Sequence, residues 1–472
     1  RKLFLIEHCI FGVDIQPIAT QISKLRFFIS LVVDQRPTKD ASDNFGIRPL
    51  PNLESNFVTA NTLVPLNREK SVFLDNPDVI FYESQLKELN HRLFQCKNST
   101  KKEELVRSLI DTRRSLAQVM ENEGLIGEIG YNQLLAWDMF DQNASSPFFD
   151  PEWMFGVKDG FDIVIGNPPY TQIRKGIYSK SFFPYSEGKD VGKQNLYKLF
   201  VEYSYNILKE HGVSVLIVQS SLMCDMSSTF TRELLLKNTE LINVIEFPKN
   251  SPNANDRVFK SVLQGTCICV FRKGINDLAN SFGISINNNL STINNIEIER
   301  VCQNEIIESF PNRKELPLIT KGEMAIINKI KKLPKLETLL DASLQGNINT
   351  IHLKKIQSKE ASDLYIAKGA NIHRYYIDNE LFYGLDNSIT RPLVTNNKCA
   401  GAVIATQNIT GTTDRFRIHA TMVECKKTKF VFLHSVNILY LPNPRTARLV
   451  LACLNSRLLD WLFRKTSTNN HC

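Results

Sequence analysis

The chain alternates between apolar runs of strand length and longer segments in which apolar residues recur at helical spacing. Residues 9–34 show this clearly, with the sequence CIFGVDIQPIATQISKLRFFISLVVD. A short apolar run ends at Asp14, and Pro17 stands where the first residue of a helix is expected. Apolar residues then follow every three or four positions, at Ile18, Ile22, Leu25, Ile29 and Val32. The pattern predicts a strand, a tight turn and a helix, which is one step of a parallel α/β sheet.

The same alternation returns in residues 161–273. FDIVIG, VSVLIV, LINVIEF and TCICVF have the length and composition of strands. A helix face lies between the first two, at Leu196, Leu199, Phe200, Tyr203 and Ile207. VSVLIV, residues 213–218, is apolar at every position except Ser214 and is typical of a central parallel strand buried on both faces. Strands and helices at this spacing predict an α/β fold with a doubly wound, Rossmann-like sheet.

The remaining segments differ in composition and divide the chain. Residues 35–66 are rich in Pro and Asn, with one candidate strand at residues 56–60. Leucines at helical spacing, separated by charged residues, predict an antiparallel helical insertion. An Asn- and Ser-rich stretch reads as a linker, and the rest combines a helix near 321–332, short β-rich runs and a helix from about Pro444 to Lys465. We therefore expect the segments 1–66, 67–150 (insertion), 151–275, 276–320 (linker) and 321–472, the last a separate mixed α+β domain.

Composition limits the class of protein. The 472 residues are 43% hydrophobic and 22% charged, which fits a globular chain of about three domains. No apolar stretch reaches the roughly eighteen residues of a membrane span, and the start RKLFLIEHCI has no signal-peptide core. The ten cysteines form no C-x-x-C, and the eight histidines complete no metal-ligand spacing. We therefore expect free thiols in a reducing cytoplasm, no membrane partner and no metal.

Positive charge is concentrated at the C-terminal end. Residues 301–472 hold 24 Lys+Arg against 14 Asp+Glu, a balance of +10, whereas residues 1–300 have a balance of −2. A segment that meets a polyanion has this footprint. Since a mild excess of charge also serves solubility, charge alone leaves nucleic-acid binding and plain solubility both open.

The segment FDIVIGNPPY, residues 161–170, carries the strongest chemical signal. Asn167, Pro168, Pro169 and Tyr170 follow directly on an expected buried strand, at the strand end where ligands of open α/β sheets bind. The side-chain oxygen of Asn167 and the main-chain oxygen of Pro168 can accept both N–H hydrogens of an exocyclic ring amine. The prolines stiffen the turn, and Tyr170 offers a flat face to a base. The alternative is a structural turn without function.

With these residues in view, the chain resembles the adenine-specific (N6) DNA methyltransferases of type II and type IIG restriction–modification systems. NPPY after an apolar strand is similar to the catalytic motif of amino-group methyltransferases that use S-adenosylmethionine. The resemblance extends over IFGVDIQPIATQISKLRFFISLVVDQ, the helical insertion, KQNLYKLFVEYSYNILKEHG and the closing LVLACLNSRLLDWLFRKTSTNN. It implies a prokaryotic cytoplasmic enzyme with S-adenosylmethionine as cofactor, double-stranded DNA as partner, and a target-recognition domain at residues 321–472.

The resemblance also implies roles for single residues on the cofactor side. Asp14, at the end of FGVD, matches the acidic residue that holds the ribose hydroxyls of the cofactor, and Ile15 would flank its adenine ring. Asn61, in VTANTL, stands where the family often has an Asp that contacts the adenine amine. The Asn departs from that pattern but can still accept a hydrogen bond.

On the DNA side, Phe259 in RVFKSV resembles the aromatic residue that supports the extruded base, with a core phenylalanine as the alternative. GANIHRYYI, residues 369–377, resembles a recurrent segment of the recognition domain and contains Arg374. Arg374 is a candidate for a phosphate or a guanine edge. Further candidates for DNA contact, each also plausible as an ordinary surface residue, are Arg391, Arg415 and Arg417.

The family's glycine-rich cofactor loop should precede FGVD, yet the chain contains no G-x-G, and Gly124, Gly127 and Gly130 have the wrong spacing. We therefore expect an N-terminally truncated fragment that binds S-adenosylmethionine poorly and methylates nothing by itself.

No nuclease site is evident, because the E-x-K triplets at 187–189 and 424–426 are of a kind that arises often by chance. A restriction endonuclease module would lie upstream or in a separate subunit. The rival interpretations are an NPPY-type protein-glutamine or ribosomal-RNA methyltransferase and a non-catalytic DNA-binding remnant of a broken gene.

Overall fold

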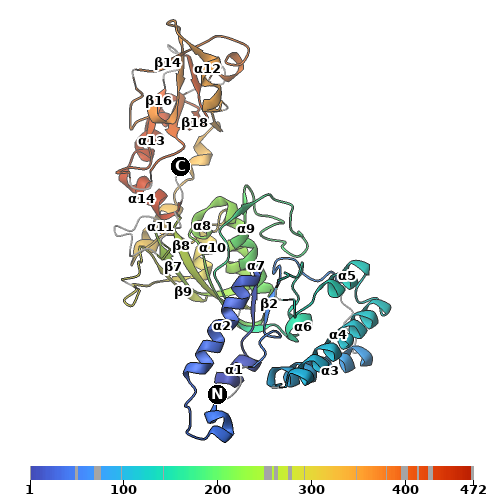
Figure 1. The fold of residues 1–472 in the computed structure, drawn as a ribbon. Coiled ribbons are helices and arrows are strands. Elements are labelled where there is room, and N and C mark those ends of the chain that lie inside the picture. The colour runs from blue at the N-terminus through green and yellow to red at the C-terminus, as the bar shows by residue number, and fades with distance from the viewer. Residues whose placement is uncertain are drawn as a thin grey trace. The chain divides into compact units, whose positions relative to one another are not determined.

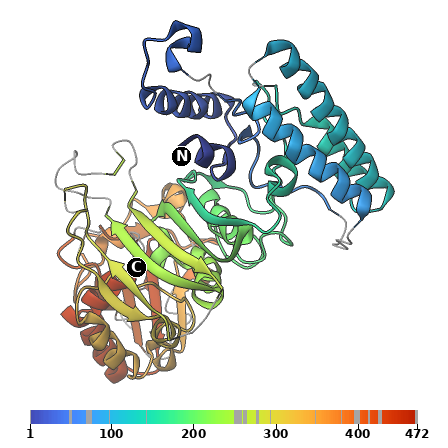
Figure 2. The same ribbon diagram turned by 90° about the horizontal axis from the view of Figure 1, so that it is seen from below.

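A computed structural model describes most of the protein and divides it into two compact units. The described residues are 2–47, 51–68, 76–96, 98–141, 143–248, 258–259, 264–274, 279–291, 293–346, 348–378, 380–394, 402–411, 414–423 and 429–468. Unit 1 comprises Arg1–Asp162 and Tyr203–Lys209, and unit 2 comprises Ile163–Glu202 and Glu210–Cys472. Figures 1 and 2 show the helices and strands of both units.

Unit 1 begins with the predicted strand–helix–strand step. Its elements are α1 (Lys2–His8), β1 (Gly12–Asp14), α2 (Pro17–Val33), β2 (Phe57–Thr59), α3 (Pro77–Gln95), α4 (Ser99–Asn122), α5 (Glu128–Ala136) and α6 (Pro151–Phe155). Strands β1 and β2 pair in parallel, with Asp14 opposite Thr59, and α2 is the crossover between them. Pro17 is the first residue of α2, where its fixed φ suits a helix and its missing N–H is not needed. The prediction for this step is confirmed.

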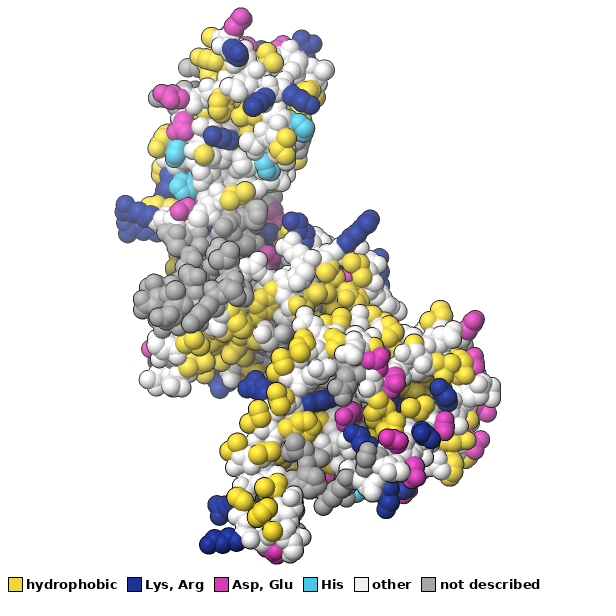
Figure 3. All heavy atoms as spheres, in the orientation of Figure 1, with side chains coloured by type: hydrophobic (Ala, Val, Ile, Leu, Met, Phe, Trp, Pro, Cys, Tyr) yellow, Lys and Arg dark blue, Asp and Glu magenta, His cyan; other side chains and the backbone are white. Residues whose placement is uncertain are grey.

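The apolar residues of α2 whose spacing predicts the helix lie largely at the surface, as the hydrophobic side chains in Figure 3 illustrate. Its members are Ile18, Ile22, Leu25, Ile29 and Val32, which are 50–60% exposed. Another face of α2 packs inward through Phe27, Phe28 and Leu31 against a buried cluster. The cluster consists of Ile6, Leu53, Phe57 and Phe94. It joins α1, α2, β2 and α3 into one small core.

Helices α3, α4 and α5 lie within residues 67–150, the interval for which the sequence predicts a helical insertion. Helices α3 and α4 pack side by side in Figures 1 and 2, and α5 contacts α4. Asn76 and Asn98 begin the first two helices, because the side-chain oxygen of each accepts backbone N–H groups of the first turn. The leucines that predicted the helices include buried ones at Leu86, Leu93, Leu105, Leu109 and Leu116. Among the described residues, none of the helices combines the length and the apolar character of a membrane span.

A six-stranded mixed sheet, in the order β10-β9-β7-β8-β6-β3, forms the central layer of unit 2. Its strands are β3 (Phe161–Gly166), β6 (Leu208–Gln219), β7 (Thr239–Phe247), β8 (Thr266–Lys273), β9 (Ser281–Ser285) and β10 (Glu299–Cys302). The accompanying helices are α7 (Leu196–Ile207), α8 (Ser221–Cys224), α9 (Thr229–Asn238) and α10 (Gln303–Ser309). Strand β8 runs antiparallel to β6 and β7, whereas β7 and β9 are parallel. The α/β class is confirmed, and the sheet is mixed.

Two strand predictions differ from the structure. Strand β6, expected to be parallel and buried on both faces, pairs antiparallel with β8, and its residues alternate between buried and half-buried. Strand β3, expected to be buried, is the last strand in the sheet order, with Ile163 62% and Ile165 78% exposed. An outermost strand has a neighbour on one side only, so an apolar composition does not by itself bury it.

The interval 276–320, which the sequence favours as a linker, contributes β9, β10 and α10 to this sheet. Phe282 and Ile284 alternate with polar residues along β9 and are 0% exposed, and Val301 of β10 is 1% exposed. The abundant Asn and Ser residues mask this short period-two pattern.

Residues 321–472 contain two further four-stranded sheets, in the orders β11-β18-β15-β16 and β12-β14-β13-β17. The strands are β11 (Ala342–Gln345), β12 (Gln357–Ser358), β13 (Leu364–Ala367), β14 (Phe382–Gly384), β15 (Ala402–Gln407), β16 (Ala420–Val423), β17 (Lys429–Phe432) and β18 (Val436–Leu441). The helices are α11 (Glu323–Lys331), α12 (Leu353–Ile356), α13 (Pro444–Leu454) and α14 (Arg457–Lys465).

The single closing helix expected from Pro444 to Lys465 is two helices, because Ser456 caps α14 by accepting the N–H of Leu459 at 3.1 Å. The backbone N–H of Leu318 donates to the oxygen of Lys465 at 2.7 Å, and both residues belong to unit 2. The independence of residues 321–472 as a domain stays a prediction.

Glu246, near the end of β7, makes the stability of unit 2 depend on pH. Its side chain is buried, and burial raises the pKa of its carboxyl to about 7 against the hydrogen bond that Asn287 N–H donates at 2.8 Å. The unfolded chain ionises Glu246 near its ordinary pKa of 4.5, whereas the folded chain holds the proton up to about 7. The free energy of unfolding should therefore fall by about 3 kcal/mol as pH rises through this window and then level off.

Urea unfolding at a series of pH values checks this expectation. Glu246→Gln should flatten the profile between these pKa values, whereas Glu308→Gln, at an exposed position, should keep it. Equal slopes for the original chain and Glu246→Gln would contradict the assignment.

Candidate functional site

Residues 167–170 follow directly on β3 as a loop segment, with Asn167 exposed, Pro168 buried and Tyr170 half-buried. The phenol O–H of Tyr170 donates to the backbone oxygen of Ile217 at 3.1 Å and also lies 3.3 Å from Oδ1 of Asn167. The ring of Tyr170 meets the ring of Phe259 edge to face, with centroids 6.4 Å apart. Unit 2 therefore brings Asn167, Tyr170 and Phe259 together, although Phe259 is distant in sequence.

Tyr170 is a neutral hydrogen-bond donor in this setting. Burial, with a smaller contribution from Cys267, raises the pKa of its phenol to about 12. Its proton is directed at the carbonyl of Ile217 in the neighbouring strand β6. This bond orients the ring, and the polar edge of the phenol faces the sheet.

Asn195 and Gln219 hold the backbone at Tyr170 through hydrogen bonds. The short strands β4 (Gln172–Ile173) and β5 (Gln194–Asn195) pair antiparallel, which places Asn195 opposite Gln172. The Nδ2 of Asn195 donates to the backbone oxygen of Tyr170 at 3.3 Å and to Oε1 of Gln219 at 3.2 Å. Gln219 in turn donates to Gln264. The segment that contains Tyr170 is therefore held by two buried amides, Asn195 at the end of β5 and Gln219 at the end of β6.

Buried acidic side chains fix the loop between β4 and β5. Glu187, 0% exposed, accepts the Nε2 of Gln194 at 2.7 Å and the N–H of Gly176. Glu202 accepts the N–H groups of Tyr185 at 2.9 Å and Ser186 at 2.7 Å. Burial raises the pKa of Glu202 against these bonds. The E-x-K triplet at 187–189 is thus part of a structural network, and the one at 424–426 lies outside the described residues.

Unit 1 places the expected cofactor residues at the ends of two paired strands. Asp14 ends β1, Ile15 follows it and is 55% exposed, and Asn61 comes just after β2. The N–H of Ala60 donates to the backbone oxygen of Asp14 at 2.9 Å, which holds the two strand ends together. The carboxylate of Asp14 is exposed and accepts the N–H of Gln16 at 2.8 Å, and it has further acceptor capacity. The side-chain oxygen of Asn61 accepts the N–H of Leu63 at 3.3 Å, so the amide is oriented by its own loop.

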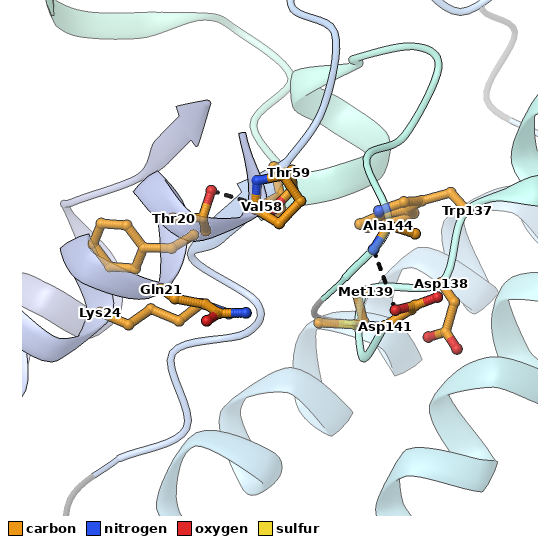
Figure 4. A pocket seen from close by; sticks show the side chains of 12 residues that line it. Thr20, Gln21, Lys24, Val58, Thr59, Trp137, Asp138, Met139, Asp141 and Ala144 are labelled. Atoms are coloured by element: carbon orange, nitrogen blue, oxygen red, sulfur yellow. Dashed lines mark hydrogen bonds between the residues drawn. The ribbon is translucent and has the colours of Figure 1, made fainter. Parts of the chain in front are cut away.

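A hollow of about 330 Å³, open to solvent, lies next to β2 in unit 1 (Figure 4). Thr20, Gln21 and Lys24 of α2 line one side, and the segment 137–144 lines the other. Burial lowers the pKa of Lys24, against the attraction of Glu54. Asp14, Ile15 and Asn61 do not line this hollow. The hollow is therefore distinct from the expected cofactor site.

The four arginines proposed for DNA contact have different environments. Arg417 is 2% exposed and lies over the ring of Phe463 at 4.6 Å, so its guanidinium is part of the core and is not presented to a ligand. Arg374 is half-buried: it donates to the backbone oxygen of Asn455 and lies over the ring of Phe416 at 3.8 Å. The expectation for Arg417 is wrong in this structure, because the sequence does not reveal that an aromatic ring covers it.

Arg391 and Arg415 are exposed, as predicted for a surface role. Arg391 pairs with Asp386 at 2.8 Å, a contact between two exposed side chains that costs little to break. Arg415 lies 5.5 Å from the ring of Phe416. On the face shown in Figure 3, the Lys and Arg side chains of the C-terminal part are scattered and do not form one continuous patch.

Sequence reasoning missed residues that shape the site. Asn195 lies within the segment KQNLYKLF, whose resemblance signalled importance without giving a role.

Tyr375 and Tyr376 lie in GANIHRYYI beside Arg374 and are each 58% exposed. Tyr375 has a φ of 75°, a conformation that is costly for an aromatic residue, and the ring of Tyr376 stacks on His373 at 4.7 Å. Exposed, strained aromatic residues mark this hairpin tip as a candidate contact surface.

Residues 8–252 match the family described as Eco57I restriction-modification methylase. No curated protein matches the chain. Among solved structures, the type I restriction-modification system methyltransferase subunit from Streptococcus thermophilus is 20% identical, with 39% of this chain and 43% of that chain covered and a TM-score of 0.28.

Two further solved structures extend over more of the chain. A nuclease-deletion mutant of the Type ISP restriction-modification enzyme LlaGI, in complex with a DNA substrate mimic, is 11% identical, with coverages of 67% and 41% and a TM-score of 0.42. The type IIG restriction endonuclease BpuSI is 14% identical, with coverages of 80% and 55% and a TM-score of 0.29. The chain spans less than two thirds of the length of each of these three proteins.

Proposed function

Because the chain belongs to the family of Eco57I restriction-modification methylases, we propose that it carries the base-binding part of an enzyme that transfers a methyl group from S-adenosylmethionine to the N6 amine of adenine in double-stranded DNA. The reaction would mark the sites of a restriction–modification system. The observation that carries the proposal is the cluster of Asn167, Tyr170 and Phe259 at the carboxyl end of β3. It combines an amide oxygen with two aromatic rings, the set that an extruded aminopurine needs.

Asn167 and Pro168 orient the amine. The lone pair of an adenine amine is delocalised into the ring, so the nitrogen is a poor nucleophile. Oδ1 of Asn167 accepts one N–H and the main-chain oxygen of Pro168 accepts the other, which favours a tetrahedral nitrogen with its lone pair free. In the absence of a base, the phenol oxygen of Tyr170 lies 3.3 Å from the same Oδ1, while its proton is directed at the carbonyl of Ile217. The contribution is positioning and electrostatic preorganisation, with no covalent enzyme intermediate.

Tyr170 and Phe259 compensate for removing the base from the duplex. Extrusion costs on the order of a few kcal/mol in lost pairing and stacking. Stacking on an aromatic ring returns about 1–3 kcal/mol per base. Because the rings meet edge to face at 6.4 Å, one ring can stack on the face of the base while the other contacts its edge.

Asp14 and Asn61 would hold the ribose hydroxyls and adenine amine of the cofactor, and Ile15 would cover one face of its adenine. When bound, S-adenosylmethionine supplies an electrophilic methyl group on a sulfonium. Asp14 would contribute acceptor oxygens and Asn61 an amide with an acceptor and two donors, so both bind and orient without moving a proton. DNA is the proposed macromolecular partner, and a restriction endonuclease module would act on the same sites.

Product analysis tests the proposal. The full-length gene product that contains these residues is incubated with S-adenosylmethionine and duplex DNA, and the digested nucleosides are separated by mass. N6-methyladenine is the expected product. N4-methylcytosine would overturn the adenine assignment, methylation of ribosomal RNA or of a glutamine peptide would favour the rival substrates, and no product would favour a DNA-binding remnant.

Binding of the chain to duplex DNA should weaken steeply with salt. The +10 balance of residues 301–472 indicates several phosphate contacts, each of which releases counterions. The slope of log K against log salt should be about −4 to −7, and Arg415→Ala should reduce its magnitude by about 1. Fluorescence anisotropy at a series of salt concentrations measures this, with Arg300→Ala, an exposed arginine of β10, as the matched control. A slope near zero would remove DNA from the proposed partners.

A further inference from the structure

Glu7, His8 and His91 gather in unit 1, where α1 lies against α3. Oε1 of Glu7 is 2.7 Å from Nδ1 of His91, and Oε2 is 3.6 Å from Nε2 of His8. One ligand atom from each of the three residues lies within 4.8 Å of the other two. The two imidazole rings stack with centroids 6.0 Å apart. Methyl transfer gives these residues no role.

The carboxylate of Glu7 lacks the hydrogen bond that its burial requires. The side chain is only 10% exposed, and Oε1 is shielded from solvent and accepts no hydrogen bond, although His91 Nδ1 is 2.7 Å away. A buried carboxylate oxygen that accepts no hydrogen bond is costly, and the nearby Nδ1 of His91 offsets that cost only when the imidazole is protonated. When two side chains bind the same cation, their ligand atoms lie close together without forming a hydrogen bond. The contact between Oε1 of Glu7 and Nδ1 of His91 has this form.

The positions of these side chains are fixed by the small core of unit 1. Ile6, next to Glu7, and Phe94, one turn after His91, are both buried in the same cluster. The Nδ2 of Asn56 donates to the backbone oxygens of Ile6 at 3.1 Å and Glu7 at 2.9 Å. The end of α1 and the middle of α3 are therefore held in place without help from the three polar side chains.

We propose that Glu7, His8 and His91 bind a divalent transition-metal ion, with Zn²⁺ as the best match and a fourth coordination position open to solvent. Two imidazole nitrogens and a carboxylate oxygen are a zinc ligand set, whereas Mg²⁺ and Ca²⁺ prefer oxygen ligands alone. Tetrahedral zinc with bonds of about 2.0–2.1 Å spaces its ligand atoms about 3.3 Å apart. In the structure His91 lies 2.7 Å from Oε1 of Glu7, His8 lies 3.6 Å from Oε2, and one ligand atom from each residue lies within 4.8 Å of the others, so side-chain rotations would bring the three atoms to this spacing.

The ion can reach the site, because His8 and His91 are 42% and 51% exposed. Once bound, it links α1 to α3 and so to the helical insertion. Metal that binds only the folded site stabilises the fold by mass action. Helix α1 leads directly into β1, the strand that ends at Asp14, so the ion would stiffen the segment from which that residue projects.

Calorimetric titration of the whole chain with ZnCl₂, after removal of metal by a chelator, tests the proposal. We expect one saturable site, with affinity reduced at least about 10-fold by His91→Asn, by His8→Asn and by Glu7→Gln. Zn²⁺ should raise the melting temperature of the original chain and leave that of His91→Asn unchanged. Because both histidines are exposed, their variants should fold, and circular dichroism verifies this.

Two controls separate this cluster from other Zn²⁺ ligands. His352→Asn removes another exposed histidine, and Cys9→Ser removes the exposed thiol that follows His8; both variants should bind as the original chain does. Loss of binding in Cys9→Ser with retention in His91→Asn would assign the ion to the thiol and overturn the proposal. A folded chain with a dissociation constant weaker than about 1 mM would overturn it as well.

Discussion

Asn167→Ala should reduce methyl transfer at least about 100-fold while the protein stays folded. The side chain is exposed on a turn at the end of β3, so the core does not depend on it. Its removal deletes one of the two acceptors that orient the amine, and an acceptor needed only at the reacting nitrogen should affect kcat more than the binding of DNA. Single-turnover methylation of a cognate duplex, compared with DNA binding by the same variant, measures both effects.

Two further variants sharpen this test. Asn304→Ala removes another asparagine whose side-chain hydrogen bond is exposed, and it should retain full activity. Asn195→Ala leaves Asn167 intact but removes the donor to the backbone oxygen of Tyr170. Its rate should be intermediate. Near-normal methylation by Asn167→Ala would assign the chemistry to other residues.

The sequence was most informative where a function depends on a short continuous segment. NPPY at the end of an apolar run predicted that Asn167 and Tyr170 follow directly on a strand, and in the structure residues 167–170 come directly after β3. Phe259 was expected near the base from resemblance alone, and unit 2 places its ring against Tyr170. The strand–helix–strand step of unit 1 was predicted for the same reason, because Pro17 and the helical spacing are local signals.

The sequence was least informative where the environment of a residue is set by distant segments. Arginine is a residue type that usually lies at the surface, but the ring of Phe463 covers Arg417. Ile163 and Ile165 read as core residues, but β3 is the outermost strand of its sheet. Glu7 and His91 meet only because Ile6 and Phe94 share a core, and no ligand spacing along the chain records that.

Arg232, in α9, is a second example of a charged side chain that the fold places in its interior, and its loss should destabilise unit 2 by about 3–5 kcal/mol. The residue is 0% exposed. Nη1 donates to the backbone oxygens of Leu222 at 2.9 Å and Asp225 at 2.8 Å. Nε donates to the oxygen of Lys314 at 2.9 Å, and Nη2 to that of Arg313 at 2.6 Å. The guanidinium thus joins α8 and α9 to the chain that follows α10.

Arg232→Ala leaves these carbonyl oxygens buried without donors and opens a cavity, and each unsatisfied group costs about 1–3 kcal/mol. Arg232→Lys should recover only part of the loss, because an ammonium cannot reproduce the planar fork of five donors. Urea unfolding followed by circular dichroism measures both variants, with Arg300→Ala as the matched control, since Arg300 is exposed and so is its hydrogen bond to the backbone oxygen of Ser281. A midpoint for Arg232→Ala equal to that of the control would mean that solvent replaces the arginine, and that α9 and the segment after α10 are not held together by it.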